Sequence, residues 1–281
     1  MGISRGAVKL IAMQLVDDER DRGKAITYGV QAVQATLDDV TALLQDTKYG
    51  TPACRIKTAT LDEKVPQKSI HQKELFTIFG YSSVESIDYY PDENPTYVLD
   101  LNQAVPPDLH SQYDLVYDGG TMEHCFNSAV FLQNTVKLLK PGGIVIHHVP
   151  MNNWVNHGFY QFSPTLFFDY YSTNGFTDLQ MIIHTMARGK ERFLLYDPCK
   201  HDYMPYSLGG KDRILIFFRA RKTENANTHD LQNPIQGRYR QTFGKEESTS
   251  SITNKTGFDR FVTRFKKSLK KRLFKYQFKS L

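Results

Sequence analysis

Cysteine is scarce in this sequence, and long apolar runs and a secretory leader are missing. Three cysteines in 281 residues are too few and too scattered for a disulfide framework. No apolar run approaches the roughly 18–20 residues that a transmembrane helix needs; residues 214–218 are a typical run. The first residues also lack the apolar segment of a signal peptide. We therefore expect a cytoplasmic protein.

Net positive charge is missing from most of the chain, although the whole carries a formal net charge of +5. Residues 257–281 hold nine Lys or Arg and one acid, Asp259, so the remaining residues have a net charge of −3. A protein that reads nucleic acid over its whole surface would be basic throughout. Nucleic acid is therefore the least favoured partner.

The basic segment also carries apolar residues at helical spacing. These are Phe258, Phe261, Val262, Phe265, Leu269 and Leu273. A helix of this kind can lie on an anionic membrane surface or bind an acidic partner. We predict a basic amphipathic helix over 257–281 that holds the protein at the inner membrane surface. Docking of the apolar stripe on the chain's own domain is the alternative.

Short apolar segments alternate with amphipathic ones over residues 1–222. The predicted strands are residues 24–30, 83–90, 96–102, 113–118, 143–150, 176–186 and 213–221. The predicted helices are residues 1–22, 36–44, 69–79, 124–140 and 163–172. Such alternation predicts one α/β domain, a sheet flanked by helices. Residues 223–256 are polar without apolar periodicity, and are predicted to link this domain to the basic helix.

The most specific pattern lies in two neighbouring stretches. Residues 113–124 read YDLVYDGGTMEH, and residues 138–150 read LLKPGGIVIHHVP. This pair resembles the central motifs of class I S-adenosylmethionine (SAM) dependent methyltransferases, of the methyltransferase type 11 kind. In that family an aromatic-Asp-aliphatic-Val strand, an acid-His pair and a helix precede a Leu-Lys-Pro-Gly-Gly turn into a strand that ends in proline. The resemblance implies a Rossmann-like sheet of seven strands with a reversed final hairpin, and SAM as methyl donor.

The resemblance also implies cofactor-binding residues at the carboxyl ends of the strands, where open sheets bind ligands. Asp88 would accept the ribose hydroxyls, Asp100 would lie by the adenine, and Leu101 would pack on the adenine face. The residues expected near the methyl donor follow the fourth strand, where small residues allow close approach. They are Asp118, Gly119 and Gly120.

The first family motif is reduced in this chain. In place of an acid and several glycines it has TYGVQ, in which Gly29 can present its amide to the SAM carboxylate and Gln31 can add a donor. This reduction leaves a second interpretation open, a methyltransferase-fold binding or scaffold protein that has lost catalysis. Separately, Asp88 and Asp100 have an alternative as simple turn residues at strand ends.

Histidines gather near the fourth and fifth predicted strands. A hydroxyl acceptor needs a general base, and the candidate catalytic residues are His157, His148 and His124. His147 and His148 must face opposite sides of their strand. Histidines in an apolar strand are also common as satisfied core groups.

Two neighbouring features bear on the acceptor. Glu123 and His124 have a structural alternative, in which they orient the helix that follows. Residues 152–164, NNWVNHGFYQFSP, combine amides with the one tryptophan of the chain. That combination suits a sugar or another hydroxylated acceptor.

No pair of histidines or cysteines has the spacing of a metal site, so no metal is expected. The sequence thus predicts a SAM-dependent methyltransferase that methylates a small-molecule or glycan acceptor, at a hydroxyl. An inactive fold and a methyltransferase of protein or nucleic acid remain the alternatives.

Overall fold

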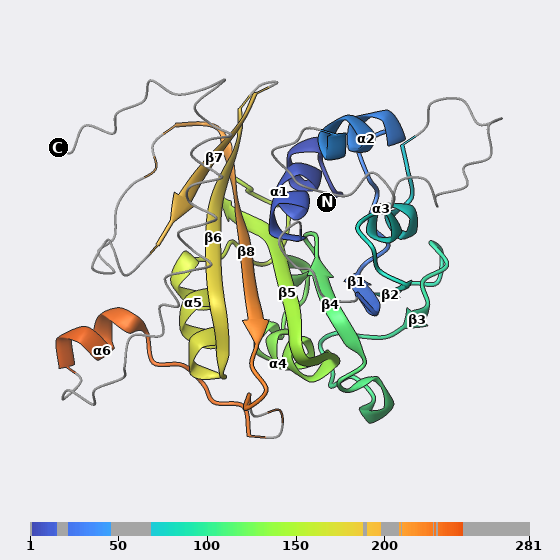
Figure 1. The fold of residues 1–281 in the computed structure, drawn as a ribbon. Helices are drawn as coiled ribbons and strands as arrows, with labels where there is room; N and C mark the ends of the chain where they lie inside the picture. Colours follow the sequence, from blue (N-terminus) through green and yellow to red (C-terminus); the bar gives the residue numbers. More distant parts are fainter. Residues whose placement is uncertain are drawn as a thin grey trace.

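The chain folds around one sheet of eight strands, in the order β3-β2-β1-β4-β5-β8-β6-β7 (Figure 1). The computed structural model describes residues 2–15, 22–45, 69–187, 190–197, 208, 210–226, 228 and 230–243. The strands are β1 Lys24–Tyr28, β2 Ser83–Asp88, β3 Tyr97–Val98, β4 Tyr113–Asp118, β5 Leu139–Asn152, β6 Phe176–Ala187, β7 Lys190–Tyr196 and β8 Arg213–Lys222.

Strand direction divides the sheet into two parts. Neighbouring strands from β3 to β5 are parallel, whereas β8 pairs antiparallel with both β5 and β6, and β7 pairs antiparallel with β6. The expected parallel sheet with a reversed end is thus confirmed, but the sheet has eight strands where seven were predicted. The additional strand, β7, forms a hairpin with β6 at the sheet edge.

Helices cover both faces of the sheet. The helices are α1 Arg5–Leu15, α2 Leu37–Gln45, α3 Gln72–Ile78, α4 Ser128–Leu138, α5 Pro164–Thr173 and α6 Gly237–Phe243. One core cluster joins α1, α2 and α3 to one face, and the other joins α4 and α5 to the opposite face. Leu115 and Tyr117 of β4 belong to the first cluster and Val116 to the second, as strand alternation requires.

Several predicted boundaries differ from the structure. The strand predicted over 96–102 is only Tyr97–Val98, because the chain turns at Asp100. The helix predicted over 124–140 is Ser128–Leu138, capped by the Asn127 side chain, which accepts from the Val130 amide. Strand β5 begins at Leu139, ahead of the Lys-Pro-Gly-Gly segment, and its pairing with β4 shifts register there.

The described part of residues 223–243 contacts α5. Asn174 Oδ1 accepts from the Gln232 amide, and the Asp169 carboxylate accepts from the Gly237 amide and from Arg240. This part of the predicted linker therefore lies against the domain. The helix predicted over 257–281 lies outside the described residues. None of the helices in the described ranges has the length and apolar character required to cross a bilayer.

Candidate functional site

The candidate site lies where the chain reverses its direction of progress across the sheet. Strands β2 and β3 lie on one side of β1, and β4 and β5 lie on the other. At such a switch point the loops that follow the two central strands diverge and leave a crevice at the carboxyl ends. The loops after β1 and β4 are joined by Thr121, whose hydroxyl donates to the Tyr28 carbonyl at 2.9 Å.

Gly29 forms a tight turn directly after β1. Its φ is +74°, in the left-handed region that favours glycine, and its amide donates to the Ile87 carbonyl of β2 at 2.7 Å. A Cβ at this position would lie 3.1 Å from Gln31 Nε2 and 3.2 Å from Thr121 Oγ1. A side chain at this position would therefore crowd Gln31 and Thr121.

Asp88 lies at the end of β2, beside the turn formed by Gly29. Its Oδ2 accepts from the Val30 amide at 3.2 Å, and its Oδ1 accepts from the Tyr89 amide at 2.7 Å. Oδ2 lies 3.8 Å from the point where a Gly29 Cβ would be. The structure thus brings Asp88 and Gly29 together at the ends of β2 and β1.

Gln31 fills the space between the two loops. Its Nε2 donates to the Tyr28 carbonyl at 2.6 Å, and its backbone amide donates to Gln72 Oε1 of α3 at 2.6 Å. Its own Oε1 is buried without a hydrogen-bond partner in the described structure and would lie only 2.4 Å from a Cβ on Gly119. Gln31 therefore lies beside Gly119, where both loops meet.

The residues predicted at the adenine lie in the turn after β3. Asp100 Oδ1 accepts from the backbone amide and from the side-chain amide of Asn102, at 2.9 and 2.8 Å. Leu101 is almost completely buried and belongs to the α4–α5 core cluster. Its packing gives Leu101 a core role in the structure, alongside the predicted contact with adenine.

Asp118 shapes the loop that leaves β4. It is fully buried, and its Oδ1 accepts from the Gly120 and Thr121 amides at 3.2 and 2.8 Å. Gly120 adopts a φ of +100°, which the sharp turn requires. Oδ2 lies 2.8 Å from His147 Nδ1. Both oxygens of this predicted cofactor-binding residue are therefore engaged within the protein.

The predicted catalytic histidines fall into two places. His148 is buried on the sheet face that carries α1, where its Nε2 lies 3.0 Å from His184 Nδ1 and its ring packs on Phe217. Burial and the neighbouring His184 lower its pKa well below the usual range. His148 is thus a core residue, and the structure does not bring it together with His124 and His157.

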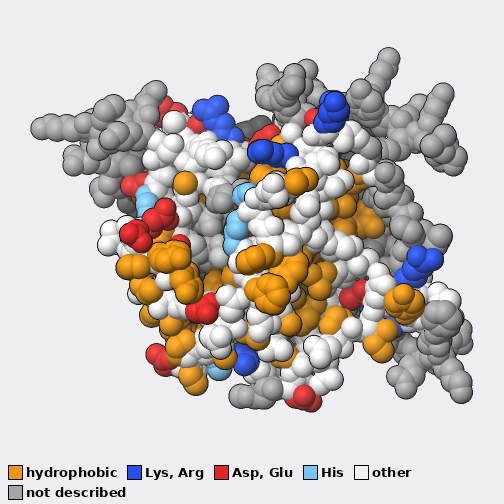
Figure 2. Space-filling view, turned by 180° about the vertical axis from the view of Figure 1, so that it is seen from behind, with side chains coloured by type: hydrophobic (Ala, Val, Ile, Leu, Met, Phe, Trp, Pro, Cys, Tyr) orange, Lys and Arg blue, Asp and Glu red, His pale blue; other side chains and the backbone are white. Residues whose placement is uncertain are grey.

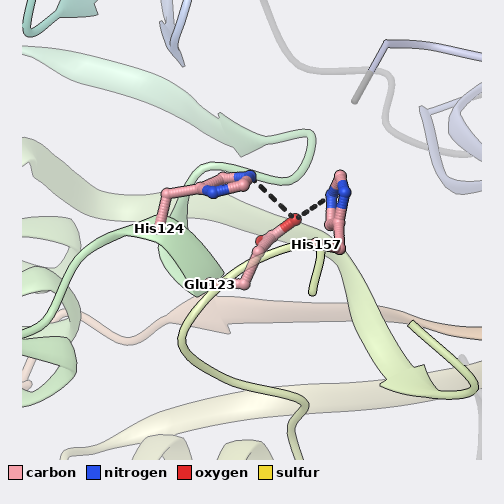
Figure 3. Close-up of side chains that lie close together, drawn as sticks. All are labelled: Glu123, His124 and His157. Atoms are coloured by element: carbon pink, nitrogen blue, oxygen red, sulfur yellow. Dashed lines mark ion pairs between the residues drawn. The ribbon is translucent and has the colours of Figure 1, made fainter. Parts of the chain in front are cut away.

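His124 and His157 converge on Glu123 (Figure 3). Glu123 and His124 lie in the 3-10 helix η3, Met122–His124, and His157 lies in the loop after β5. His157 Nε2 lies 3.4 Å and His124 Nε2 lies 3.8 Å from Glu123 Oε1. The Glu123 carboxylate is fully buried, whereas the two imidazoles are partly exposed. The group therefore extends from the protein interior to the surface.

Burial changes the acidity of all three groups. Desolvation, followed by the charge of Asp118, raises the pKa of Glu123 to about 8. Desolvation lowers the pKa of His124, and desolvation together with the neighbouring His124 lowers that of His157. The lowered pKa values of both imidazoles favour the neutral form, in which histidine accepts a proton.

Aromatic residues lie on the same segments as this group. The His157 ring packs on Trp154, with ring centroids 4.9 Å apart. Phe126 and Phe159 are exposed and meet edge to face, and Tyr160 contacts Phe126 as well. Figure 2 shows one face of the molecule on which hydrophobic side chains gather beside histidines. An acceptor at the Glu123 group would thus meet aromatic surface.

The sequence did not indicate the contacts that Gln72 and Thr121 make with the turn after β1. It also did not indicate that Glu123 and His157 lie together. Nothing in the sequence marks Gln72 or Thr121, because their contacts depend on the packing of α3 and of the loop after β4. Glu123 and His157 lie 34 positions apart, a spacing typical of no known motif. The Glu-His pair of the central motif was the available signal for Glu123.

Comparison with solved structures finds methyltransferases among similar chains. The N-methyltransferase NodS from Bradyrhizobium japonicum is 12% identical, with 77% of this chain and 94% of that chain covered and a TM-score of 0.39. The YcgJ protein from Bacillus subtilis is 9% identical, with 78% and 100% covered and a TM-score of 0.41. The 1,6-didemethyltoxoflavin-N1-methyltransferase from Burkholderia thailandensis is 13% identical, with 78% and 79% covered and a TM-score of 0.37. No family model and no curated protein matches the chain.

Proposed function

We propose that this protein is a SAM-dependent methyltransferase that methylates a hydroxyl of a small-molecule or glycan acceptor. The observation that carries the proposal is the position of Asp88. Its carboxylate lies at the carboxyl end of β2, against the left-handed turn of Gly29 that follows β1, one of the two strands at the switch point. A carboxylate at that position can accept both hydroxyls of a ribose.

The residues of the crevice fit a nucleoside ligand. The Gly29 turn leaves the backbone after β1 free of a side chain at the point of closest approach. The loop after β4 is fixed by Asp118, so that Gly119 and Gly120 keep a defined path beside it. In this proposal Gly29, Gln31 and Asp88 hold the donor from one side, and the loop after β4 holds it from the other.

The acceptor side of the site lies on the same loop. Glu123 and His124 follow Gly120 by only a few residues, so an acceptor at Glu123 would lie next to a donor held by the glycines. Methyl transfer requires that acceptor oxygen, methyl carbon and sulfur be aligned and shielded from water. A hydroxyl acceptor must also lose its proton. We assign His124 and His157 to the activation of that oxygen.

The surroundings of the histidines favour a hydroxylated acceptor. Phe126 and Phe159 offer exposed rings on which a sugar ring or an aromatic ring can pack. Trp154 is less available, because it is buried and its indole nitrogen donates to the Ile214 carbonyl. The side chain of Asn153 donates to two backbone carbonyls and holds its own loop.

Calorimetric titration with SAM and with S-adenosylhomocysteine tests the proposal. We expect micromolar binding to the wild-type chain and at least a tenfold loss in Asp88→Asn, which keeps an acceptor for the Val30 amide but removes the charge. Asp108→Ala, at an exposed acid of the 3-10 helix Pro107–Leu109, serves as the matched control and should bind normally. Absence of binding to well-folded protein would overturn the proposal in favour of a binding protein without catalysis.

A further inference from the structure

The Glu123 carboxylate has no hydrogen-bond donor in the described structure. Both of its oxygens are buried, and its side chain has no exposed surface. Burying an ionised carboxylate without a partner is costly, so such groups are normally paired, bound to a cation or protonated. His157 Nε2 is also buried without a hydrogen-bond partner. Two complementary groups, an acid and an imidazole, thus face each other without forming a hydrogen bond.

The distances within the group are close to those of a metal site. The ligand atoms of Glu123, His124 and His157 all lie within 4.8 Å of one another, and the two imidazole nitrogens lie 3.8 and 3.4 Å from the same carboxylate oxygen. Tetrahedral zinc with bonds of about 2.0–2.1 Å separates its ligand atoms by about 3.4 Å. Small side-chain rotations would therefore bring all three atoms to one ion. Figure 3 shows both imidazole nitrogens directed at the carboxylate.

Backbone contacts hold the two segments of this group in place. The Phe159 amide donates to the Glu123 carbonyl at 2.7 Å. A Cβ on Gly158 would lie 2.7 Å from that carbonyl and 2.9 Å from Glu123 Cγ, so this close approach requires glycine. Packing of the His157 ring on Trp154 limits the rotation of the ring. The ligand atoms are thus preorganised by contacts that do not involve an ion.

We propose that Glu123, His124 and His157 bind one divalent metal ion, and that this ion is zinc. Two imidazoles and one carboxylate form a ligand set that zinc uses in catalytic sites, where a fourth position stays open. The partial exposure of His124 and His157 places that open position toward the surface. The sequence predicted no metal, because adjacent residues 123 and 124 with a distant third ligand match no spacing pattern.

The role of the ion rests on the proposed function. The hydroxyl oxygen of the acceptor would occupy the fourth position, where a bound divalent ion lowers the pKa of the hydroxyl. The hydroxyl proton would be released to bulk solvent on the side where His124 and His157 are partly exposed. The oxygen forms its new bond to the methyl carbon as the carbon–sulfur bond breaks and its electron pair returns to sulfur. His124 and His157 would thus activate the oxygen through the ion.

Metal titration of the untagged full-length chain tests the site. After removal of metal with a chelator, we expect the wild-type chain to take up one equivalent of zinc, measured by calorimetry and by elemental analysis after dialysis. Glu123→Gln, which preserves shape, and His157→Ala should each weaken binding by about 100-fold or more. His110→Ala, at a histidine remote in sequence from the group, is the matched control and should bind as the wild type does.

A second probe identifies the ligands. Cobalt bound at this site should give the visible bands of a nitrogen–oxygen ligand set without a thiolate charge-transfer band. Zinc should also raise the melting temperature of the wild type but not of Glu123→Gln, because a ligand that binds the native state stabilises it. A thiolate band, or unchanged binding in Glu123→Gln and His157→Ala, would overturn the proposal.

The titrations separate the two proposals. One equivalent of zinc in the wild type, lost in Glu123→Gln, without SAM binding would support the metal site and overturn the methyltransferase proposal. SAM binding without zinc uptake would support the methyltransferase proposal and overturn the metal site.

Discussion

Asp118 Oδ2 lies 2.8 Å from His147 Nδ1, and neither side chain has any exposed surface. The other carboxylate oxygen accepts amides of the following loop, and His147 Nε2 lies 2.6 Å from the Tyr171 hydroxyl of α5. This buried chain connects α5, β5 and the loop that carries Glu123. A residue expected beside the methyl donor is therefore the internal support of the loop on which both halves of the candidate site depend.

Asp118→Asn should destabilise the fold and weaken SAM binding. The variant keeps one oxygen for the loop amides but places an amide group where Oδ2 faces His147 Nδ1. Disrupting a buried hydrogen bond of this kind costs about 1–3 kcal/mol. Chemical denaturation monitored by circular dichroism measures the loss. Asp114→Asn, at the exposed end of the same strand, is the control. Its carboxylate pairs with Lys140 at the surface, so we expect a change within about 1 kcal/mol. Equal stability of the two variants would contradict the role given to Asp118.

Lys222→Met should destabilise the protein more at high pH than at neutral pH. Lys222 Nζ donates to the Val136 and Leu139 carbonyls at the end of α4, and the side chain is almost fully buried. Burial lowers the pKa of Lys222 to about 8.

The direction of this pH dependence follows from proton uptake on unfolding. Between about pH 8 and the usual lysine pKa of about 10.4, the unfolded chain binds more protons at this residue, so the native state gains stability as pH rises. Removal of the donor leaves two buried carbonyls unpaired, which costs about 1–3 kcal/mol. Denaturation of wild type and variant at pH 7 and pH 10 checks the difference. If wild type and variant differed in unfolding free energy by the same amount at both pH values, the lowered pKa of Lys222 would be contradicted.

Gly29→Ala should weaken SAM binding and reduce stability by about 1–2 kcal/mol. The left-handed backbone disfavours alanine by about 1–2 kcal/mol, and the new Cβ would press on Gln31 and Thr121. Gly210→Ala controls for backbone strain alone, since Gly210 has a φ of +114° and a Cβ added there would meet no atom within 4 Å. The control should lose stability but bind SAM normally. Normal SAM affinity in Gly29→Ala would remove this turn from the donor site.

His157→Ala should abolish turnover while SAM affinity is kept. Loss of a group that activates the acceptor oxygen lowers the rate by about 100-fold or more. Release of S-adenosylhomocysteine measures turnover with an acceptor that the wild type uses, and calorimetry measures SAM affinity. Unchanged turnover would exclude His157 from the reaction. His148→Ala tests the histidine that lies in the core. It should lower stability, because the contact with His184 is lost.

Removal of residues 257–281 should abolish sedimentation with anionic vesicles. Nine basic side chains contribute on the order of 1 kcal/mol each near an anionic surface, and salt weakens the attraction. The full-length chain should bind anionic but not neutral vesicles, and less at high salt. Retained binding by the shortened chain would contradict a membrane role for this segment.

Local sequence patterns were sufficient to predict strands whose apolar residues are consecutive or are followed by a clear polar residue. The apolar run after the Lys-Pro-Gly-Gly segment indicated β5, and the acid at the end of SVESID indicated Asp88 at a strand end. Strand β7, KERFLLY, was missed because it begins with three charged or polar residues, and an edge strand needs apolar contacts on one face only. Pairing with β6 completes it.

The sequence by itself determined the α/β class, the positions of most strands along the chain and the pair of motifs around β4 and β5, because hydrophobic periodicity and helix-stopping residues act locally. Only the tertiary structure decided which partners the polar residues have. Both oxygens of Asp118 have hydrogen-bond partners in the interior, and His148 lies against His184. It also placed His157 beside the unpartnered carboxylate of Glu123. Such partners depend on contacts between distant segments, which only the packed sheet and its loops create.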